Sequence, residues 1–428
     1  MRKTKIICTI GPACENEEIL TEMCKAGMNV ARLNFSHGTH EEHLSKIRLI
    51  RSVREKLNLP IAIMLDTKGP EYRIKTFENG KTTLKDGDTF ILTSDDIIGD
   101  ETRVSVTYCN LTNELHPDDT VLINNGLVIL KVREISGNDV ICSVVAGGEL
   151  SNRKSMNFPG KVLKQAFLSE QDRKDILFGI ENDVDFIAAS FVSCKEDVQA
   201  IRTLLDENGG KEIDIIAKIE NRSGVDKIDE ICEIADGIMV ARGDLGVEIP
   251  FMEVPAIQKY LIKKCRMLGK RVITATEMLE SMIQNPRPTR AEISDVANAV
   301  YDGSSAIMLS GETAAGRYPV QAVKVMAETA CFTEQGINYA DRFHNSEFRI
   351  KNNLDAISHS TCSMAMDVHA KAIVVNSISG RTARMVSRFR CPIDIIGTTT
   401  REALTGIPLE NVAARLLLQE TLAVVDIP

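Results

Sequence analysis

The feature that most restricts the fold of this chain is a regular alternation of short apolar runs with amphipathic helical stretches. The apolar runs predict strands at Lys5–Ile10, Val30–Asn34, Ile61–Asp66, Phe186–Ser190, Ile213–Ile219, Gly237–Val240, Arg271–Thr274 and Ala306–Leu309. Helical periodicity predicts helices at Glu17–Ala26, Glu41–Leu57, Ser169–Asn182, Lys195–Glu207, Glu253–Leu268 and Arg290–Tyr301. Strands that alternate with helices pair in parallel, and about eight such units indicate a closed (β/α)8 TIM barrel. A doubly wound open sheet is the alternative, but no GxGxxG sequence follows the first strand.

Two of these helices carry a start signal. Ser169 is followed by Asp172, and Thr289 by Glu292, each three residues further on. This is the spacing of a capping box, in which each side chain accepts a hydrogen bond from the backbone N–H of the other residue. We therefore expect helices to begin directly after Ser169 and Thr289.

The alternation is interrupted between about Glu71 and Ala166. Helical periodicity disappears there, and turn signals appear at Asn79-Gly80, Asp86-Gly87, Asn125-Gly126 and Ser136-Gly137. Strand-like runs separate these turns, which is typical of a small all-β domain. Because the segment follows the third predicted strand, it lies on a βα loop over the barrel mouth. We expect it to act as a lid.

A further α/β stretch begins after about Asn345. Helices are predicted at Leu354–Asp367 and Arg381–Phe389, and strands at Ala372–Val375 and Ile393–Ile396. Beyond Thr398 there is one weak helical pattern and one short apolar strand. The predicted domains are therefore a barrel at 1–70 and 167–340, an inserted β-barrel lid at 71–166, and an α/β C-terminal domain at 345–428.

Composition excludes several classes of protein. The net charge of −9 over 428 residues argues against a nucleic-acid or anionic membrane surface, because both need concentrated positive charge. No apolar run approaches the ~18 residues of a membrane span. The eleven cysteines are scattered singly without a CxxC pair, which suits reduced thiols in a cytosol. The chain is predicted to be soluble and cytoplasmic.

Polar residues collect at the carboxyl ends of the predicted strands, where the catalytic groups of barrel enzymes lie. They are Arg32, Asn34, Ser36 and His37 after strand two, Asp66, Thr67, Lys68 and Glu71 after strand three, Lys218 and Glu220 after strand five, Arg242, Gly243 and Asp244 after strand six, Thr276 and Glu277 after strand seven, and Ser310 and Glu312 after strand eight. Carboxylates bind Mg²⁺, and hydroxyl and amide oxygens suit a larger hard cation. The set predicts a polar cup for an anionic substrate and metal ions. Neither a Walker A nor an HExxH motif is present.

Seven segments in this arrangement resemble the motifs of the pyruvate kinase family. They are Ala31–Gly38 (ARLNFSHG), Leu65–Arg73 (LDTKGPEYR), Lys218–Val225 (KIENRSGV), Met239–Glu248 (MVARGDLGVE), Thr274–Met282 (TATEMLESM), Asn285–Asn298 (NPRPTRAEISDVAN) and Met308–Gly316 (MLSGETAAG). They occur in the family's order and with similar separations, so that the resemblance runs from Lys3 to about Gly397. It implies transfer of the phosphoryl group of phosphoenolpyruvate to ADP, giving pyruvate and ATP in the last step of glycolysis.

The resemblance also implies roles for individual residues. Asn34, Ser36, Asp66 and Thr67 match the K⁺ ligands, Glu71 the acidic residue linked to K⁺ dependence, and Glu220 and Asp244 the ligands of Mg²⁺ (or Mn²⁺). Lys218 matches the lysine beside the transferred phosphoryl group, Arg32 a phosphate-binding cation, and Gly243, Asp244 and Thr276 the groups that hold the substrate carboxylate. His37, Arg73 and Lys154 match nucleotide contacts under the lid. Thr276, Ser310 and Glu312, or a water that they hold, are alternatives for the catalytic proton path to the enolate.

The sequence departs from the family at three places. The motifs of the family's C-terminal domain are not recognised from Thr398 onward, which predicts a truncated domain and puts the usual homotetramer and effector regulation in doubt. Asn124-Asn125 replaces an acidic pair of the lid, which bears on lid closure or nucleotide binding. Glu277 stands where glutamine is common and adds negative charge near the mouth.

Two other functions remain open at this stage. One is a non-catalytic or unstable remnant with a binding or regulatory role, motivated by the short C-terminal part. The other is a different metal-dependent barrel enzyme of 2-oxo acids, such as an aldolase or phosphonomutase. The insertion after strand three argues against the second alternative, because an aldolase has no need of a nucleotide lid.

Overall fold

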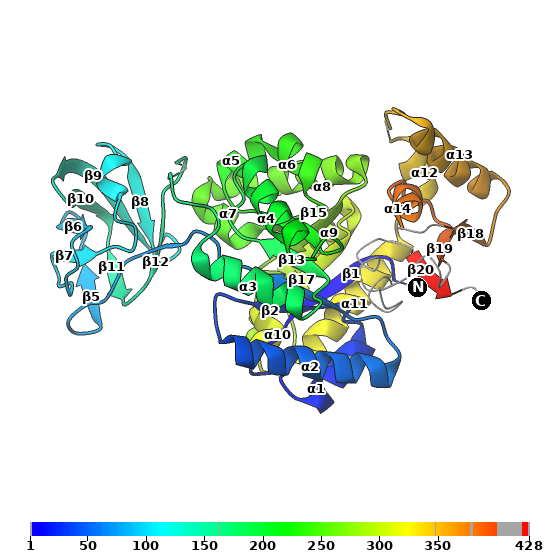
Figure 1. The fold of residues 1–428 in the computed structure, drawn as a ribbon, viewed down its shortest axis with the longest axis horizontal. Helices are drawn as coiled ribbons and strands as arrows, with labels where there is room; N and C mark the ends of the chain where they lie inside the picture. The colour runs from blue at the N-terminus through cyan, green and yellow to red at the C-terminus, as the bar shows by residue number, and fades with distance from the viewer. Residues whose placement is uncertain (1, 162, 347, 377–379, 400–421, 427–428) are drawn as a thin grey trace.

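A closed eight-stranded parallel barrel forms the centre of the molecule (Figure 1). The computed structural model describes residues 2–161, 163–346, 348–376, 380–399 and 422–426. The barrel order is β1-β17-β16-β15-β14-β13-β3-β2. Its strands are β1 (Lys5–Thr9), β2 (Val30–Asn34), β3 (Ala62–Asp66), β13 (Phe186–Ala189), β14 (Asp214–Ile219), β15 (Gly237–Ala241), β16 (Arg271–Ala275) and β17 (Ala306–Leu309). All eight predicted strands are confirmed to within one or two residues.

Helices surround the strands of the barrel. They are α1 (Glu17–Ala26), α2 (His40–Leu57), α3 (Glu170–Glu181), α4 (Lys195–Glu207), α5 (Arg222–Asp226), α6 (Ile228–Ile234), α7 (Arg242–Glu248), α8 (Val254–Leu268), α9 (Arg290–Asp302), α10 (Gly311–Ala314) and α11 (Pro319–Gln335), with 3₁₀ turns η2 (Phe251–Glu253) and η3 (Glu280–Ile283). Both predicted capping boxes are present: the Ser169 hydroxyl accepts from Asp172 N–H at 3.0 Å, and the Thr289 hydroxyl from Glu292 N–H at 3.2 Å. α3 and α9 begin directly after these residues.

The alternation of side chains along each strand produces two cores. Ile7 points into the barrel, where it packs with Met64, Phe186 and Met308 among others. Its neighbours Ile6 and Cys8 point outward into the larger cluster between strands and helices. Because successive side chains of a strand face opposite sides, the strands need apolar residues at every position, and they therefore read as continuous apolar runs.

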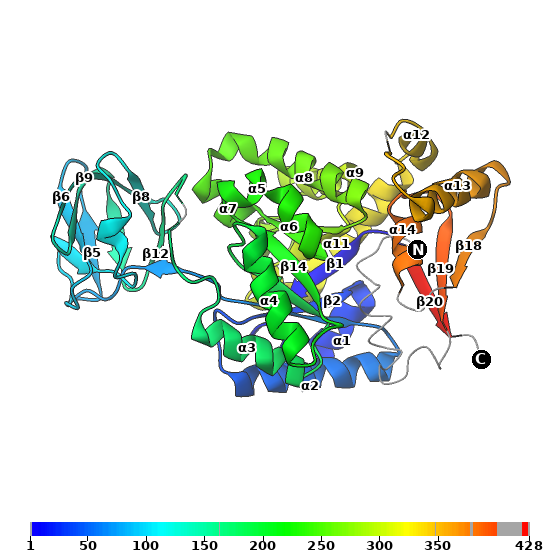
Figure 2. The ribbon, with the colours of Figure 1, turned by 45° about the horizontal axis from the view of Figure 1, so that its top comes forward.

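The lid is inserted between β3 and β13 and lies beyond one end of the barrel (Figures 1 and 2). Its strands are β4 (Tyr72–Arg73), β5 (Lys81–Leu84), β6 (Thr89–Thr93), β7 (Arg103–Ser105), β8 (Thr120–Ile123), β9 (Val128–Ser136), β10 (Asp139–Ala146), β11 (Gly148–Ser151) and β12 (Ser155–Asn157), with the turn η1 (Leu111–Asn113). They form a seven-stranded sheet, β4-β12-β8-β9-β10-β6-β7, and a two-stranded sheet, β11-β5. This is more open than the small barrel expected from the sequence, and it has its own buried core.

The C-terminal domain packs at the opposite end of the barrel from the lid (Figure 2). It contains α12 (Tyr339–His344), α13 (Asn353–Asp367), α14 (Arg381–Ser387) and a parallel sheet of β18 (Ala372–Asn376), β19 (Asp394–Thr399) and β20 (Leu422–Asp426). These elements confirm both predicted helices and strands, and β20 confirms the short apolar strand expected after Thr398. The residue limits predicted for the three domains stay predictions. None of the helices in the described ranges has both the length and the apolar character needed to span a bilayer.

Candidate active site

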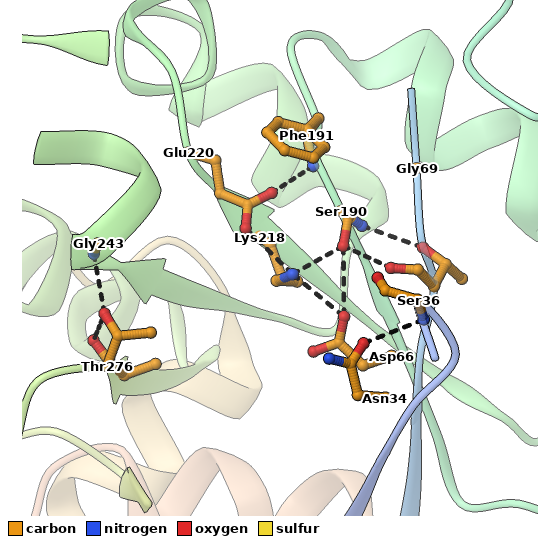
Figure 3. A network of polar contacts seen from close by, with 12 residues as sticks. Asn34, Ser36, Asp66, Gly69, Ser190, Phe191, Lys218, Glu220, Gly243 and Thr276 are labelled. Atoms are coloured by element: carbon orange, nitrogen blue, oxygen red, sulfur yellow. Dashed lines mark hydrogen bonds and ion pairs between the residues drawn. The ribbon is translucent and has the colours of Figure 1, made fainter. Parts of the chain in front are cut away.

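Five strands, β1, β2, β3, β13 and β14, contribute to a buried polar network at the barrel mouth, part of which is seen in Figure 3. Lys218 at the end of β14 is 8% exposed, and its Nζ lies 3.1 Å from Asp66 Oδ1 and 3.0 Å from Glu220 Oε1. The same Nζ donates a hydrogen bond of 2.7 Å to Ser190 Oγ. Burial acts to lower the pKa of Lys218, but the charges of Asp66 and Glu220 outweigh it and raise this pKa above its usual value. Lys218 is therefore a fixed positive charge.

Arg32 supplies a second buried cation next to Lys218. Its Nε lies 2.6 Å from Asp66 Oδ2, and its Nη1 donates to Thr9 Oγ1 at 2.8 Å. Asp66, at the end of β3, thus lies between two cations. Burial alone would raise the pKa of Asp66, but the charges of Arg32 and Lys218 lower it. The carboxylate is ionised and holds both cations in place.

Glu220 has the chemistry of a metal ligand. It is fully buried, and its Oε2 accepts a hydrogen bond of 2.6 Å from Phe191 N–H. Its Oε1 contacts Lys218 as an ion pair but accepts no hydrogen bond from any residue that the structure describes. Burial raises the pKa of Glu220 to about 8, partly opposed by Lys218 and further increased by the nearby charge of Asp244. A buried carboxylate with a second carboxylate nearby suits a divalent cation.

Two carboxylates are an incomplete ligand set for a metal held by protein alone. Among the described residues there is no group of three or more His, Cys, Asp or Glu side chains arranged to hold a metal ion. Mg²⁺ is commonly bound by one or two carboxylates, with substrate phosphates and water as its other ligands. Glu220 and Asp244 suit this second kind of site.

The predicted K⁺ ligands lie on the adjacent ends of β2 and β3. Asn34 is paired with Asp66 in the strand register, and Asn34 Oδ1 accepts from Ser36 N–H at 3.1 Å. The Thr67 hydroxyl, directly after β3, accepts from Ser190 N–H at 3.2 Å. The set offers amide, hydroxyl and carboxylate oxygens and no nitrogen or sulfur ligand, which suits a large hard cation.

Thr276 and Gly243 meet on the other side of the mouth (Figure 3). The Thr276 hydroxyl accepts from Gly243 N–H at 2.8 Å and donates to Ala275 O at 2.7 Å. Thr276 has φ +66°, which is rare for a β-branched residue and is retained mainly at functional sites. Arg242 hydrogen-bonds the carbonyl of Thr276 and pairs with Asp295, and so supports this backbone.

The carboxylate of Glu312 binds the backbone N–H of Ser310. Glu312 is fully buried, and its two oxygens accept from Leu279 N–H at 3.0 Å and from Ser310 N–H at 2.7 Å. The carboxylate therefore anchors the start of α10 to the segment before η3. Ser310 is half-buried.

The structure does not bring the three predicted nucleotide residues together. His37 lines a cavity of about 530 Å³ with Pro12 and Lys46 of the barrel. Arg73 and Lys154 line another, of about 300 Å³, between the lid and the barrel. Arg73 is held by Glu71 through contacts of 2.9 and 3.1 Å.

Asn124 and Asn125 line the same lid-side cavity as Arg73. Both have φ +56°, a left-handed conformation that asparagine adopts more readily than most residues. The amides at this departure from the family thus suit the local backbone.

Sequence reasoning missed two residues of the network. Ser190 follows β13, the fourth barrel strand, and contacts Lys218, Asp66 and Thr67. Thr9 ends β1 and holds Arg32. The rule that located the other residues, inspection of strand ends, would have found both if it had been applied to the first and fourth strands.

Comparison with known proteins gives consistent matches along the chain. The model of the pyruvate kinase barrel domain matches residues 1–323, and that of the pyruvate kinase alpha/beta domain matches residues 355–423. The prediction that the resemblance ends near Gly397 is therefore wrong. That prediction was based on short motifs, whereas the family model also counts weaker sequence similarity along the whole domain.

Individual relatives agree with the domain matches. A pyruvate kinase of Clostridium acetobutylicum is 49% identical over 98% of this chain and 87% of that protein. A pyruvate kinase of Bacillus licheniformis is 51% identical over 95% of this chain and 70% of that protein. The crystal structure of a pyruvate kinase from Cryptosporidium parvum superposes with a TM-score of 0.95 at 42% identity, covering 100% of this chain and 87% of the other. The chain therefore belongs to the pyruvate kinase family, and it is a phosphotransferase with pyruvate kinase activity.

Proposed function

We propose that the barrel mouth carries out this activity by transferring the phosphoryl group of phosphoenolpyruvate to ADP. The observation that carries the proposal is the pair of buried cations, Arg32 and Lys218, held by Asp66 and Glu220. Phosphoryl transfer depends on positioning and on neutralisation of charge, with little covalent work for the protein. Cations that are already fixed in a water-poor site stabilise the transferring group without rearranging.

Metal ions complete the charge balance in this proposal. Members of this family typically use Mg²⁺ and K⁺, and the residues that would hold them are Glu220 and Asp244 for Mg²⁺ (or Mn²⁺), and Asn34, Ser36, Asp66 and Thr67 for K⁺. When bound, the two ions would neutralise the negative charge of the two phosphorylated reactants. The buried carboxylate of Glu220, with the charge of Asp244 nearby, supports the first assignment, and the oxygen-only set on β2 and β3 supports the second.

The substrate carboxylate is assigned to the opposite side of the mouth. Gly243 and Asp244 begin α7, where backbone N–H groups are available to an anion. In this proposal the carboxylate takes the Gly243 N–H, which here donates to Thr276. The Thr276 hydroxyl then turns to the substrate.

The enolate left by transfer must receive a proton at carbon. Thr276 and Ser310, or a water between them, are proposed for this path. Because both oxygens of Glu312 accept backbone hydrogen bonds, we assign Glu312 to positioning Ser310.

Nucleotide binding is proposed to require movement of the lid. His37 on the barrel and Arg73 and Lys154 at the lid line different cavities, so that a single nucleotide meets all three only after closure. Closure would also exclude water and protect the phosphoryl group from hydrolysis. A cytoplasmic location and the oligomeric state stay predictions.

Pyruvate formation from phosphoenolpyruvate and ADP with Mg²⁺, in the presence and absence of K⁺, tests this assignment. We expect K⁺-stimulated turnover, and a loss of about 1,000-fold or more in Lys218→Met, because a fixed charge at the transferring group is removed. Lys211→Met, at an exposed turn, is the matched control and should retain full activity. No turnover from a folded, Mg²⁺-binding sample would support the remnant alternative. The family match to residues 1–323 leaves no support for an aldolase or phosphonomutase.

A further inference from the structure

Ser190 lies at the point where the predicted K⁺ ligands and Lys218 meet. It follows β13 directly, is 2% exposed, and was not among the residues expected from the sequence. Its Oγ is 2.7 Å from Lys218 Nζ, 2.7 Å from Thr67 O and 3.3 Å from Asp66 Oδ1 (Figure 3). The Ser190 hydroxyl is therefore neither a solvent-exposed group nor part of the apolar core, and its neighbours are three polar groups of the site.

The donors and acceptors of these contacts fix the direction of the hydrogen bonds. A serine hydroxyl has one proton and two lone pairs. Lys218 has only donors, so Ser190 Oγ must accept from it. The single hydroxyl proton then goes to Thr67 O, which is 0.6 Å nearer than the Asp66 oxygen (3.3 against 2.7 Å). Ser190 therefore accepts a hydrogen bond from Lys218 and donates one to the backbone carbonyl of Thr67.

The loop after β3 makes further contacts with Ser190 and its neighbours. Ser190 N–H donates to the Thr67 hydroxyl at 3.2 Å, and Thr67 N–H donates to Ala188 O at 2.9 Å. Gly69 approaches so closely that a Cβ at that position would lie 2.8 Å from Ser190 Cβ, and its φ of +71° is unfavourable for other residues. Thr67 and Ser190 thus hold each other through two hydrogen bonds, and Ser190 in turn contacts Lys218.

We infer that Ser190 is a positioning residue that couples K⁺ binding to the placement of Lys218. The inference rests on the proposed function, since it takes Thr67 and Asp66 as K⁺ ligands and Lys218 as a ligand of the substrate phosphate. An ion held by Thr67 fixes the loop, the loop orients the Ser190 hydroxyl, and the hydroxyl holds the Lys218 ammonium toward the phosphate. Asp66 gives a second, direct connection between the two sites at 3.1 Å. Loss of Ser190 should therefore reduce the coupling without abolishing it.

Calorimetric titration of phosphoenolpyruvate measures this coupling without turnover. The dissociation constant is determined with Mg²⁺ present and ADP absent, in K⁺ and in tetramethylammonium at equal ionic strength. In the unmodified chain we expect K⁺ to tighten binding by about tenfold or more, within the usual range of coupling between sites. In Ser190→Ala the factor should fall to about threefold or less, with cooperative unfolding retained.

Two variants separate the hydroxyl from other effects. Ser193→Ala removes another hydroxyl of the same loop. The Ser193 hydroxyl contacts Asn221 and Phe191 but neither Lys218 nor Thr67, so this variant should keep the full coupling. Ser190→Thr retains a hydroxyl and should keep most of it. An unchanged factor in Ser190→Ala, or an equal loss in Ser193→Ala, would overturn the inference.

A second readout uses the chain without substrate. K⁺ that binds only the folded state raises the melting temperature, and the K⁺ concentration giving half of this rise reports its affinity. Because coupling between two ligands is reciprocal, phosphoenolpyruvate should lower this concentration in the unmodified chain, and much less in Ser190→Ala. Failure of the unmodified chain to bind phosphoenolpyruvate would contradict the proposed function instead.

Discussion

The cations of the barrel mouth and those of the lid are held in different ways. Arg32 and Lys218 are each 8% exposed and contact Asp66 from two sides, with Thr9, Ser190 and Glu220 as further partners. Arg73 of the lid is about one-third exposed and pairs with the carboxylate of Glu71, two residues away. Both regions are predicted to bind phosphate groups. They differ in how firmly their cations are held in position before substrate binds.

This difference follows from the energetics of ion pairs. Removing one partner of a buried pair is costly, about 3–5 kcal/mol, because the other charge stays uncompensated in the interior. A pair that solvent partly reaches, such as Arg73 and Glu71, contributes less, because water screens the charges, and it can be exchanged more readily. The mouth is therefore preorganised, whereas Arg73 can leave Glu71 for a nucleotide phosphate when the lid closes. Three substitutions test this contrast.

Glu220→Gln should have the largest effect. It keeps the shape and the contact with Phe191 N–H but removes one of the two carboxylates proposed for Mg²⁺, and we expect turnover to fall by about 100-fold or more. Because Lys218 keeps its second ion pair, with Asp66, we expect the fold to be retained. Turnover and Mg²⁺ titration measure the effect, with Glu207→Gln on the exposed end of α4 as control. Activity within about threefold of the unmodified chain would remove Glu220 from the metal site.

Arg73→Met should have an intermediate effect of a different kind. We expect the KM for ADP to rise about tenfold while kcat changes by less than about threefold, since binding is weakened and the chemistry at the mouth is untouched. Steady-state kinetics in ADP measure both parameters, and Arg133→Met on the exposed side of β9 is the matched control. If kcat fell as far as in Glu220→Gln, the contrast between the preorganised mouth and the exchangeable lid contact would be lost.

Glu248 joins the two regions and should show the smallest effect, through pH. Its Oε1 accepts from Asn157 of the lid at 2.9 Å, and burial raises the pKa of this carboxyl. Between the usual carboxyl pKa near 4.3 and the raised value, the folded chain binds more protons than the unfolded chain. Stability from this group is therefore lost as pH rises through that window.

Glu248→Gln removes the pH-dependent loss and keeps an acceptor for Asn157. Its melting temperature should rise relative to the unmodified chain as pH increases through this window, by about 2–4 °C, and the difference should then stay constant. Thermal unfolding of both chains across pH 4–8 measures the difference, with Glu230→Gln on the exposed face of α6 as control for the substitution itself. A constant difference at all pH values would show that Glu248 does not titrate with folding.

Much of the site was predictable because its residues follow one rule of position. Asp66, Lys218 and Thr276 stand at or directly after strand ends, and apolar runs locate those ends to within one or two residues. Ser190 follows the same rule of position, at the end of the fourth strand, but a lone serine has no charge that marks it as a site residue. The separation of His37 from Arg73 was also not predictable, since motif spacing contains no information about the angle between lid and barrel.

The sequence by itself determined the order of strands and helices, the insertion after the third strand, and the family. Local patterns carry these properties, because apolar period, turn residues and motifs act over a few neighbours. Only the tertiary structure decided which carboxylate holds which cation, that Glu312 is committed to backbone N–H groups, and that Ser190 connects Lys218 with Thr67. These depend on contacts between strands that are up to 152 residues apart, as for Asp66 and Lys218, and on burial that sets the strength of each charge.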